Sequence, residues 1–271
     1  MTYGWAILII AVVLGALFAL GIFNSANLAP KLPPGSCQVF RPNGPGSTSY
    51  INTEGTCNNE LPQYVAQFNG QTASVTVPVQ NFNTNTNSYT FTAWINSGSL
   101  YPGGTGIVVS YYPYIGISVS VGDIRCWQNS YSNGLNTINT NVWVFVACDY
   151  AGMGSVSRTV YINGIAGLTD TSGSVGSYTG ASDIGYFYYS CYSTSFKGMI
   201  ANVQIYNISL SANEITALYD EGIGGVPLNL NNLVGWWPLN GNGNDYSGNL
   251  NNGVPTNVVY TSSWASSYSA P

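Results

Sequence analysis

The chain has 271 residues, of which only 6% are charged, and it contains no histidine. Its net charge is −5. Its few bases are scattered along the sequence, at Lys31, Arg41, Arg125, Arg158 and Lys197. Nucleic acids are bound by clustered Lys and Arg, so this distribution argues against a nucleic-acid partner. Since 45% of the residues are apolar, the chain is not intrinsically disordered either, because disorder requires low hydrophobicity with high net charge.

An uncharged apolar run without proline extends from Tyr3 to Phe23. About twenty residues at ~1.5 Å each span ~30 Å, the thickness of a bilayer core. The run therefore predicts a long apolar helix within residues 1–27, for assembly or for membrane anchoring. No Lys or Arg precedes Lys31, and the run is too long for a secretory signal, which argues against a cleaved signal peptide. A plain membrane anchor is the alternative.

Small residues recur on one face of this predicted helix. Ala11, Gly15 and Ala19 are spaced at i, i+4 and i+8, which lets neighbouring helices approach closely. We expect the helix to pack against copies of itself through Trp5, Ile9, Ala11, Leu14, Gly15, Phe18, Ala19 and Ile22.

The first eight residues, MTYGWAIL, and the apolar run that follows resemble archaeal type IV pilins with class III signal peptides. In that family a short basic leader is removed, and the mature helices bundle into a filament core with the β-rich domains outside. Neither the basic leader nor the glutamate near the mature N-terminus is found in this sequence. The resemblance therefore implies a filament subunit, but it leaves the cleavage site undefined.

Residues 28–62 are rich in Pro, Gly and Ser and predict a linker of turns. Without histidine or a CxxC pair a zinc site is disfavoured, so the cysteines favour disulfides and an oxidising exterior. We expect Cys37 to pair with Cys57 within the linker. A second bridge is expected between two of the other cysteines, for which buried thiols are the alternative. These are Cys126, Cys148 and Cys191.

From residue 63 onward, short alternating runs separated by turns predict an all-β sandwich or jelly roll. Residues 89, 91, 93 and 95 form one apolar face, as do Ala201, Val203 and Ile205, whereas residues 142–148 are continuously apolar like a central strand. Asn163-Gly164 is a favoured hairpin turn. One short helix is expected after the capping box Ser211-Ala212-Asn213-Glu214.

Residues 196–207 and 210–215 resemble the closing motif of laminin G-like domains, which are concanavalin A-like jelly rolls. Residues 67–70, 91–95 and 160–164 match earlier strands of that family. Residues 233–240 and 245–249 resemble its opening strand, yet they follow the closing motif. We therefore expect one circularly permuted sandwich over residues 63–271, completed by residues 230–260. A second, truncated domain is the alternative, but about 40 residues are too few for another core.

Catalytic chemistry is not indicated. Glycoside hydrolysis needs two carboxylates across the sugar, and no expected strand carries two acids at alternating positions. We expect no enzyme activity, no cofactor and no metal site, since calcium needs several oxygen ligands and acids such as Asp183 stand alone. Asn207-Ile208-Ser209 is a glycosylation sequon. The candidates for stacking on a sugar, which fit core or subunit contacts equally well, are Tyr111, Tyr112, Tyr114, Trp127, Tyr186, Tyr188 and Tyr189.

The sequence thus predicts a pilin, a homopolymer of many copies that forms an extracellular filament on the cell surface. Its helix would lie in the membrane before assembly and in the filament core afterwards. The sandwich would face outward and contact glycans or cell surfaces. The main alternative is a membrane-anchored, lectin-like adhesin that does not polymerise, followed by an anchored glycosidase.

Overall fold

The computed structural model describes residues 39–40, 51–52, 61–78, 88–99, 101, 104–111, 115–128, 130–131, 135–152, 157–171, 182–189 and 192–271. The chain divides into two units, Met1–Glu60 and Leu61–Pro271. In the first unit, β1 (Val39–Phe40) pairs antiparallel with β2 (Ile51–Asn52). The predicted helix of residues 1–27, its packing residues and the Cys37–Cys57 bridge lie outside the described residues. Within the described part of the chain, no helix combines the length and the apolar character needed to cross a membrane.

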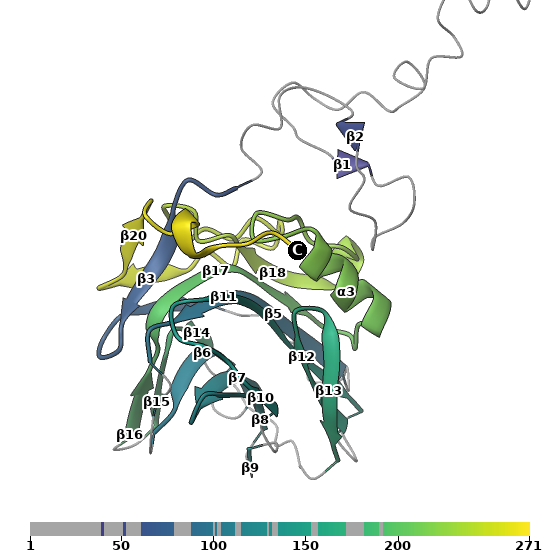
Figure 1. The fold of residues 1–271 in the computed structure, drawn as a ribbon, viewed down its shortest axis with the longest axis horizontal. Coiled ribbons are helices and arrows are strands. Elements are labelled where there is room, and N and C mark those ends of the chain that lie inside the picture. Colours follow the sequence, from purple (N-terminus) through teal and green to yellow (C-terminus); the bar gives the residue numbers. More distant parts are fainter. Residues whose placement is uncertain are drawn as a thin grey trace, which may run out of the picture. The chain divides into compact units, whose positions relative to one another are not determined.

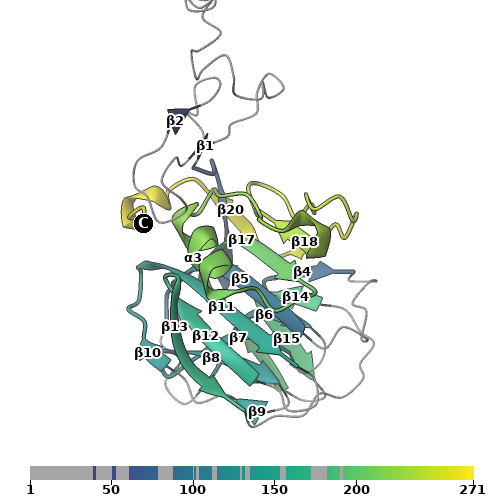
Figure 2. The same ribbon diagram turned by 90° about the vertical axis from the view of Figure 1, so that its right-hand side faces the viewer.

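The second unit is a sandwich of two antiparallel sheets (Figures 1 and 2). One sheet, here called the β7 sheet, has the strand order β10 (Leu135–Thr137), β8 (Asp123–Gln128), β7 (Ile115–Ser120), β6 (Gly106–Tyr111), β14 (Ser182–Ile184), β4 (Ser74–Val77) and β19 (Val254–Thr256). In addition, β9 (Ser130–Tyr131) pairs with β8. A separate hairpin is formed by β15 (Tyr186–Tyr189) and β16 (Tyr192–Ser195).

The other sheet, the β5 sheet, arches over the first (Figure 1). Its strand order is β13 (Ile165–Asp170), β12 (Ser157–Ile162), β11 (Trp143–Ala151), β5 (Ser88–Ser97), β17 (Lys197–Tyr206), β3 (Val65–Asn69) and β20 (Val259–Thr261). β18 (Leu233–Trp237) also pairs with β17. The mainly β fold predicted from the alternating runs is therefore confirmed for this unit, and the Asn163-Gly164 turn joins β12 to β13 as expected.

The main core lies between the two sheets. The predicted apolar face of β5 is buried there, at Tyr89, Phe91, Ala93 and Ile95. β11 is continuously apolar because both of its faces are covered: Val144 and Val146 lie in this core, and Phe145 faces the opposite side. Strand β11 lies between β12 and β5, as expected of a central strand.

The predicted face of β17 is partly wrong. Val203 and Ile205 lie in the core between the sheets, but Ala201 belongs to the cluster on the outer face of the β5 sheet. The register with β5 shifts between Ala201 and Gln204, and Asn202 has a φ of 49°. A bulge of this kind adds one residue to the strand and reverses the alternation of side chains.

A second apolar cluster covers the outer face of the β5 sheet. The helix α3 (Ala212–Asp220) begins at the predicted capping box: Ser211 Oγ accepts from Glu214 N at 3.3 Å, and Glu214 Oε2 accepts from Ser211 N at 2.8 Å. Tyr219 of α3 stacks on Trp94 of β5. Trp264, which precedes the short 3₁₀ helix η2 (Ala265–Ser267), packs in the same cluster.

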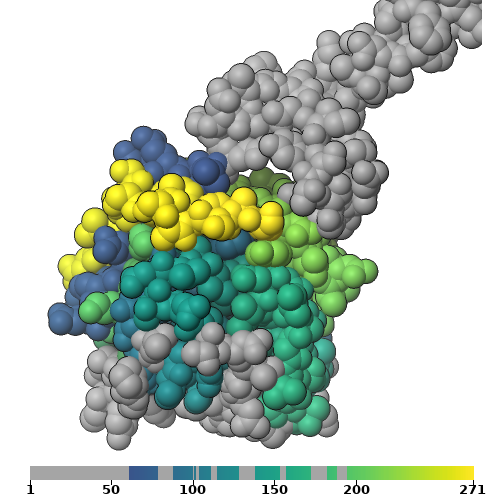
Figure 3. All heavy atoms as spheres, viewed as in Figure 1, coloured from purple at the N-terminus to yellow at the C-terminus, as the bar shows by residue number. Residues whose placement is uncertain are grey.

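The C-terminal segment contributes strands to both sheets. After the 3₁₀ helix η1 (Leu230–Asn232), β18 pairs with β17, β19 with β4 and β20 with β3. Figure 3 shows the last residues of the chain, in yellow, against the blue segment that contains β3 and β4. Trp237 of β18 is fully buried between the sheets, and its Nε1 donates to Asn251 O at 2.9 Å. Residues 230–260 are thus part of the same sandwich.

Candidate functional site

The outer face of the β7 sheet collects several residues that the sequence singled out. Strand register aligns Thr76, Asp183, Ser110, Gly116 and Trp127 in one row across β4, β14, β6, β7 and β8. Each of these residues has at least one sequence neighbour in the core between the sheets, so this polar row points away from that core. These neighbours are Val75, Val77, Ile184, Val109, Ile115, Ile117 and Cys126.

Asp183 is the carboxylate of the polar row. Thr76 Oγ1 donates to Asp183 Oδ1 at 2.7 Å. Burial raises the pKa of Asp183 above its usual value, and the hydrogen bond from Thr76 opposes this shift. Ser110 Oγ lies 3.4 Å from Asp183 O and 3.3 Å from Tyr186 O, so it links the row to the first strand of the β15–β16 hairpin.

Much of the row is covered. Ser110 is 1% exposed and Trp127 is 7% exposed. Phe187 packs edge-on against the Trp127 ring, with centroids 5.0 Å apart. Trp127 is therefore a packing residue and not an exposed ring for a sugar, whereas Tyr186 is half-buried on the same hairpin.

The other tyrosines nominated from the sequence cannot be placed on this face. The side chains of Tyr111, Tyr188 and Tyr189, and all of Tyr112 and Tyr114, lie outside the described residues. Alternating burial along β8, with Ile124 and Cys126 in the core, is the signal that assigns Trp127 to the opposite face. The covering by Phe187 involves a residue 60 positions away, which periodicity does not reveal.

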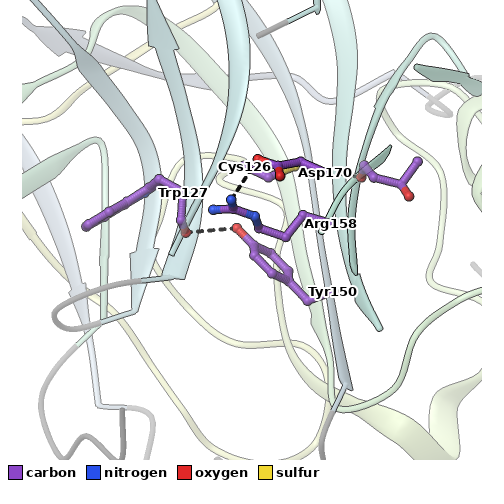
Figure 4. A network of polar contacts seen from close by, with 6 residues as sticks. Cys126, Trp127, Tyr150, Arg158 and Asp170 are labelled. Atoms are coloured by element: carbon purple, nitrogen blue, oxygen red, sulfur yellow. Dashed lines mark hydrogen bonds and ion pairs between the residues drawn. The ribbon is translucent and has the colours of Figure 1, made fainter. Parts of the chain in front are cut away.

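A buried polar network supports the row from inside the sandwich (Figure 4). The Tyr150 hydroxyl of β11 reaches the β7 sheet, where it lies 2.7 Å from Gly116 O and 3.0 Å from Trp127 O and accepts from Gly116 N at 3.2 Å. Burial raises the pKa of Tyr150, so this hydroxyl keeps its proton. At Gly116 a Cβ would lie 2.1 Å from Val109 O, so the close approach of β6 requires glycine here.

Covalent and ionic links lie beside this hydroxyl (Figure 4). A disulfide joins Cys126 of β8 to Cys148 of β11 and therefore connects the two sheets. The expectation of a bridge between two of the three later cysteines is met by this pair, and Cys191 lies outside the described residues. Arg158 of β12 is fully buried, and its NH2 group lies 2.8 Å from Asp170 Oδ2 on β13. All these groups connect strands or sheets, and the disulfide and Arg158 are fully buried and therefore inaccessible to a substrate.

The polar row contains few groups that could take part in catalysis. Asp183 is its one carboxylate, and glycoside hydrolysis uses two that flank the scissile bond. In the part of the chain that the structure describes, no group of three or more His, Cys, Asp and Glu side chains is placed to hold a metal ion. At the sequon, Ser209 Oγ donates to the buried Asp149 Oδ2 at 2.7 Å. Glycosylation of Asn207 stays a prediction.

Residues 69–216 match the laminin G-type family model described as the concanavalin A-like lectin/glucanases superfamily. The chain belongs to this family. The match covers the closing strand β17 and part of α3, and it ends before the C-terminal strands that complete the laminin G-type sandwich. A comparison with curated protein sequences gave no match.

Solved structures share the laminin G-type fold at low sequence identity. A candidate carbohydrate-binding protein from Bacteroides ovatus has a TM-score of 0.58 and 16% identity, over 73% of this chain and 60% of that chain. A heptameric SAP-like pentraxin from Limulus polyphemus has a TM-score of 0.51 and 14% identity, over 73% of this chain and 94% of that chain. A Trypanosoma rangeli sialidase has a TM-score of 0.48 and 17% identity, over 61% of this chain and 29% of that chain. The first two likenesses, with TM-scores above 0.5, support the fold and establish no activity.

Proposed function

We propose that this chain is the repeating subunit of an extracellular filament of the type IV pilus kind. The apolar segment 3–23 lies in the membrane before assembly and among copies of itself afterwards, and the laminin G-type sandwich is carried on the outside. The observation that carries the proposal is the uncharged run itself, with Ala11, Gly15 and Ala19 along one helical face.

The sandwich supports an extracellular location. Its two sheets are joined by the buried Cys126–Cys148 disulfide, and such bonds form and persist in oxidising compartments. Its residues 61–271 form a compact unit with their own core, which suits display at the end of a linker.

The membrane-anchored, lectin-like adhesin is the second candidate, because an apolar segment and a lectin-type fold suit it equally. The two candidates differ in what surrounds the small-residue face: sister helices in a filament and lipid around an anchor. Helices pack closely only where small residues let their backbones approach. A bulky residue on that face therefore harms a filament, while it leaves insertion of a single anchor intact.

Electron microscopy of the full chain from its native cell surface tests the proposal. Wild-type protein is expected to form thin fibres, and Gly15→Leu is expected to abolish them while the protein still reaches the membrane. Ala6→Leu is the matched control, because a helix places residue 6 on the face opposite residue 15. Isolated membrane-bound heads in the wild type would overturn the filament and favour the adhesin. Unchanged fibres with Gly15→Leu would overturn the role of the small-residue face in helix packing.

A further inference from the structure

A rigid loop between β18 and β19 presents an aromatic ring to solvent. Tyr246 is 54% exposed, and it is the one aromatic among the exposed large apolar side chains of the described residues. Its ring packs edge-on against Trp236 of β18, with centroids 6.1 Å apart and an interplanar angle of 64°. Trp236 is itself half-buried, so the two rings share a surface position.

The loop that carries Tyr246 is held in place by Asp245. Asp245 Oδ1 accepts from the backbone nitrogens of Trp236 (2.9 Å) and Ser247 (2.8 Å), and Oδ2 accepts from Ser247 Oγ (2.8 Å) and Asn251 N (2.9 Å). Tyr246 N also donates to Trp236 O at 2.8 Å. A ring fixed in this way loses little conformational freedom when a ligand binds.

One amide group lies beside each ring, and a third is exposed on the same loop. Asn242 Nδ2 lies 3.3 Å from the Tyr246 hydroxyl, and Asn244 is exposed on the same loop. Trp236 Nε1 donates to the buried Asn202 Oδ1 at 2.8 Å, which fixes the indole against β17. Aromatic faces with neighbouring amides are suited to a ligand that has an apolar face and several hydroxyl groups.

Charge narrows the class of ligand. Residues 198–271 contain no Lys or Arg, so the segment that forms this loop supplies no counter-ion for a sialic acid, uronate, sulfate or phosphate. Asp245 is the loop's one acid, and both of its oxygens are engaged within the loop. A neutral ligand therefore suits the loop better than an anion or a cation.

We infer that Tyr246, Trp236, Asn242 and Asn244 form a binding site for a neutral saccharide. A pyranose ring stacks on Tyr246, and its hydroxyls bond to the amides of Asn242 and Asn244. The site lies at the C-terminal loop and not on the polar row. It requires a folded sandwich, but it does not depend on filament assembly.

Ligand-detected NMR on the full chain in detergent micelles tests this site. The probes are cellohexaose and a galactose hexamer as neutral saccharides, with 3′-sialyllactose and a heparin hexasaccharide as anions. We expect at least one neutral probe to bind, and Tyr246→Ala to weaken it about tenfold or more. Tyr246→Phe keeps the ring and should bind within about threefold of the wild type.

Leu168→Ala is the matched control, because Leu168 is an apolar residue on β13 that is 58% exposed. It should bind like the wild type, and thermal unfolding of all three variants should confirm that they fold. The inference is overturned if wild-type protein binds no neutral probe, if it prefers the anions, or if Tyr246→Ala binds as well as the wild type. If Tyr246→Ala still forms fibres, its loss of saccharide binding does not result from a failure of filament assembly.

Discussion

Asp149 is a carboxyl group on β11 that is 7% exposed and lies on the outer face of the β5 sheet. Thr90 Oγ1 donates to its Oδ1 at 2.9 Å, and Ser209 Oγ donates to its Oδ2 at 2.7 Å. Burial raises the pKa of Asp149 above 3.8, and the hydrogen bond from Ser209 is the largest opposing effect. The protonated form is therefore favoured more in the folded chain than in the unfolded chain.

The raised pKa of Asp149 makes the unfolding free energy depend on pH. A raised folded-state pKa contributes stability that is fully present below the unfolded pKa of about 3.9 and is lost as the pH rises through the folded pKa. Asp149→Asn should therefore flatten the fall in unfolding free energy above about pH 4. Ser209→Ala should raise the Asp149 pKa further and extend that fall to higher pH. Urea unfolding at a series of pH values measures both, and a wild-type profile in Asp149→Asn would contradict the prediction.

The edge strand β13 is joined to β12 by a buried ion pair. Arg158 is fully buried, and Asp170 on β13 is 15% exposed. Removing one partner of such a pair costs about 3–5 kcal/mol, because the other charge stays buried without it. We expect Asp170→Ala to lower the unfolding free energy by about 3 kcal/mol.

A double variant provides the control for this ion pair. Arg158→Met with Asp170→Leu replaces both charges by apolar groups of similar size, and it should recover most of the loss. Denaturant unfolding of Arg158→Met, of Asp170→Leu and of the double variant measures the coupling. Equal destabilisation by Asp170→Ala and by the double variant would show that the charge left behind is not the cause.

Local sequence signals predicted individual elements well. The Asn163-Gly164 turn works because both residues adopt positive φ, 50° and 75°, and α3 begins at Ser211 because its hydroxyl caps the helix. Contacts distant in the sequence were not predictable. The burial of Trp127, a candidate sugar-binding residue, depends on Phe187, which packs against its ring. The exposure of Tyr246 depends on the fold of the Asp245 loop.

The pairing of the cysteines and the facing of side chains on β17 were likewise not predictable from local sequence signals. The cysteine positions allowed several pairings, and only the opposition of β8 and β11 across the core selects Cys126 with Cys148. The bulge near Asn202 reverses the facing of Ala201, which periodicity alone does not show. Sequence patterns therefore identify elements, whereas packing between the sheets decides which side chains form a site.

The C-terminal segment determines whether the sandwich is complete. Deleting residues 230–271 removes β18, β19 and β20, together with the buried Trp237 and Trp264. Loss of one buried large aromatic side chain costs about 3–5 kcal/mol, and a domain is stable by only about 5–15 kcal/mol. The deletion also removes the outer partners of β3 and β4, which become exposed edge strands that favour aggregation. We therefore expect the truncated chain to be unfolded or aggregated.

Transfer of the segment tests the permutation directly. A chain in which residues 230–271 precede residue 63 through a flexible Gly-Ser linker restores the order in which the family's opening strand comes first. Because the same strands can then pair with β17, β4 and β3, this chain should fold and melt cooperatively. Circular dichroism and size-exclusion chromatography compare it with the truncated chain and the wild type. A truncated chain that is folded and monodisperse would show that residues 230–271 are dispensable, and the permutation would then be wrong.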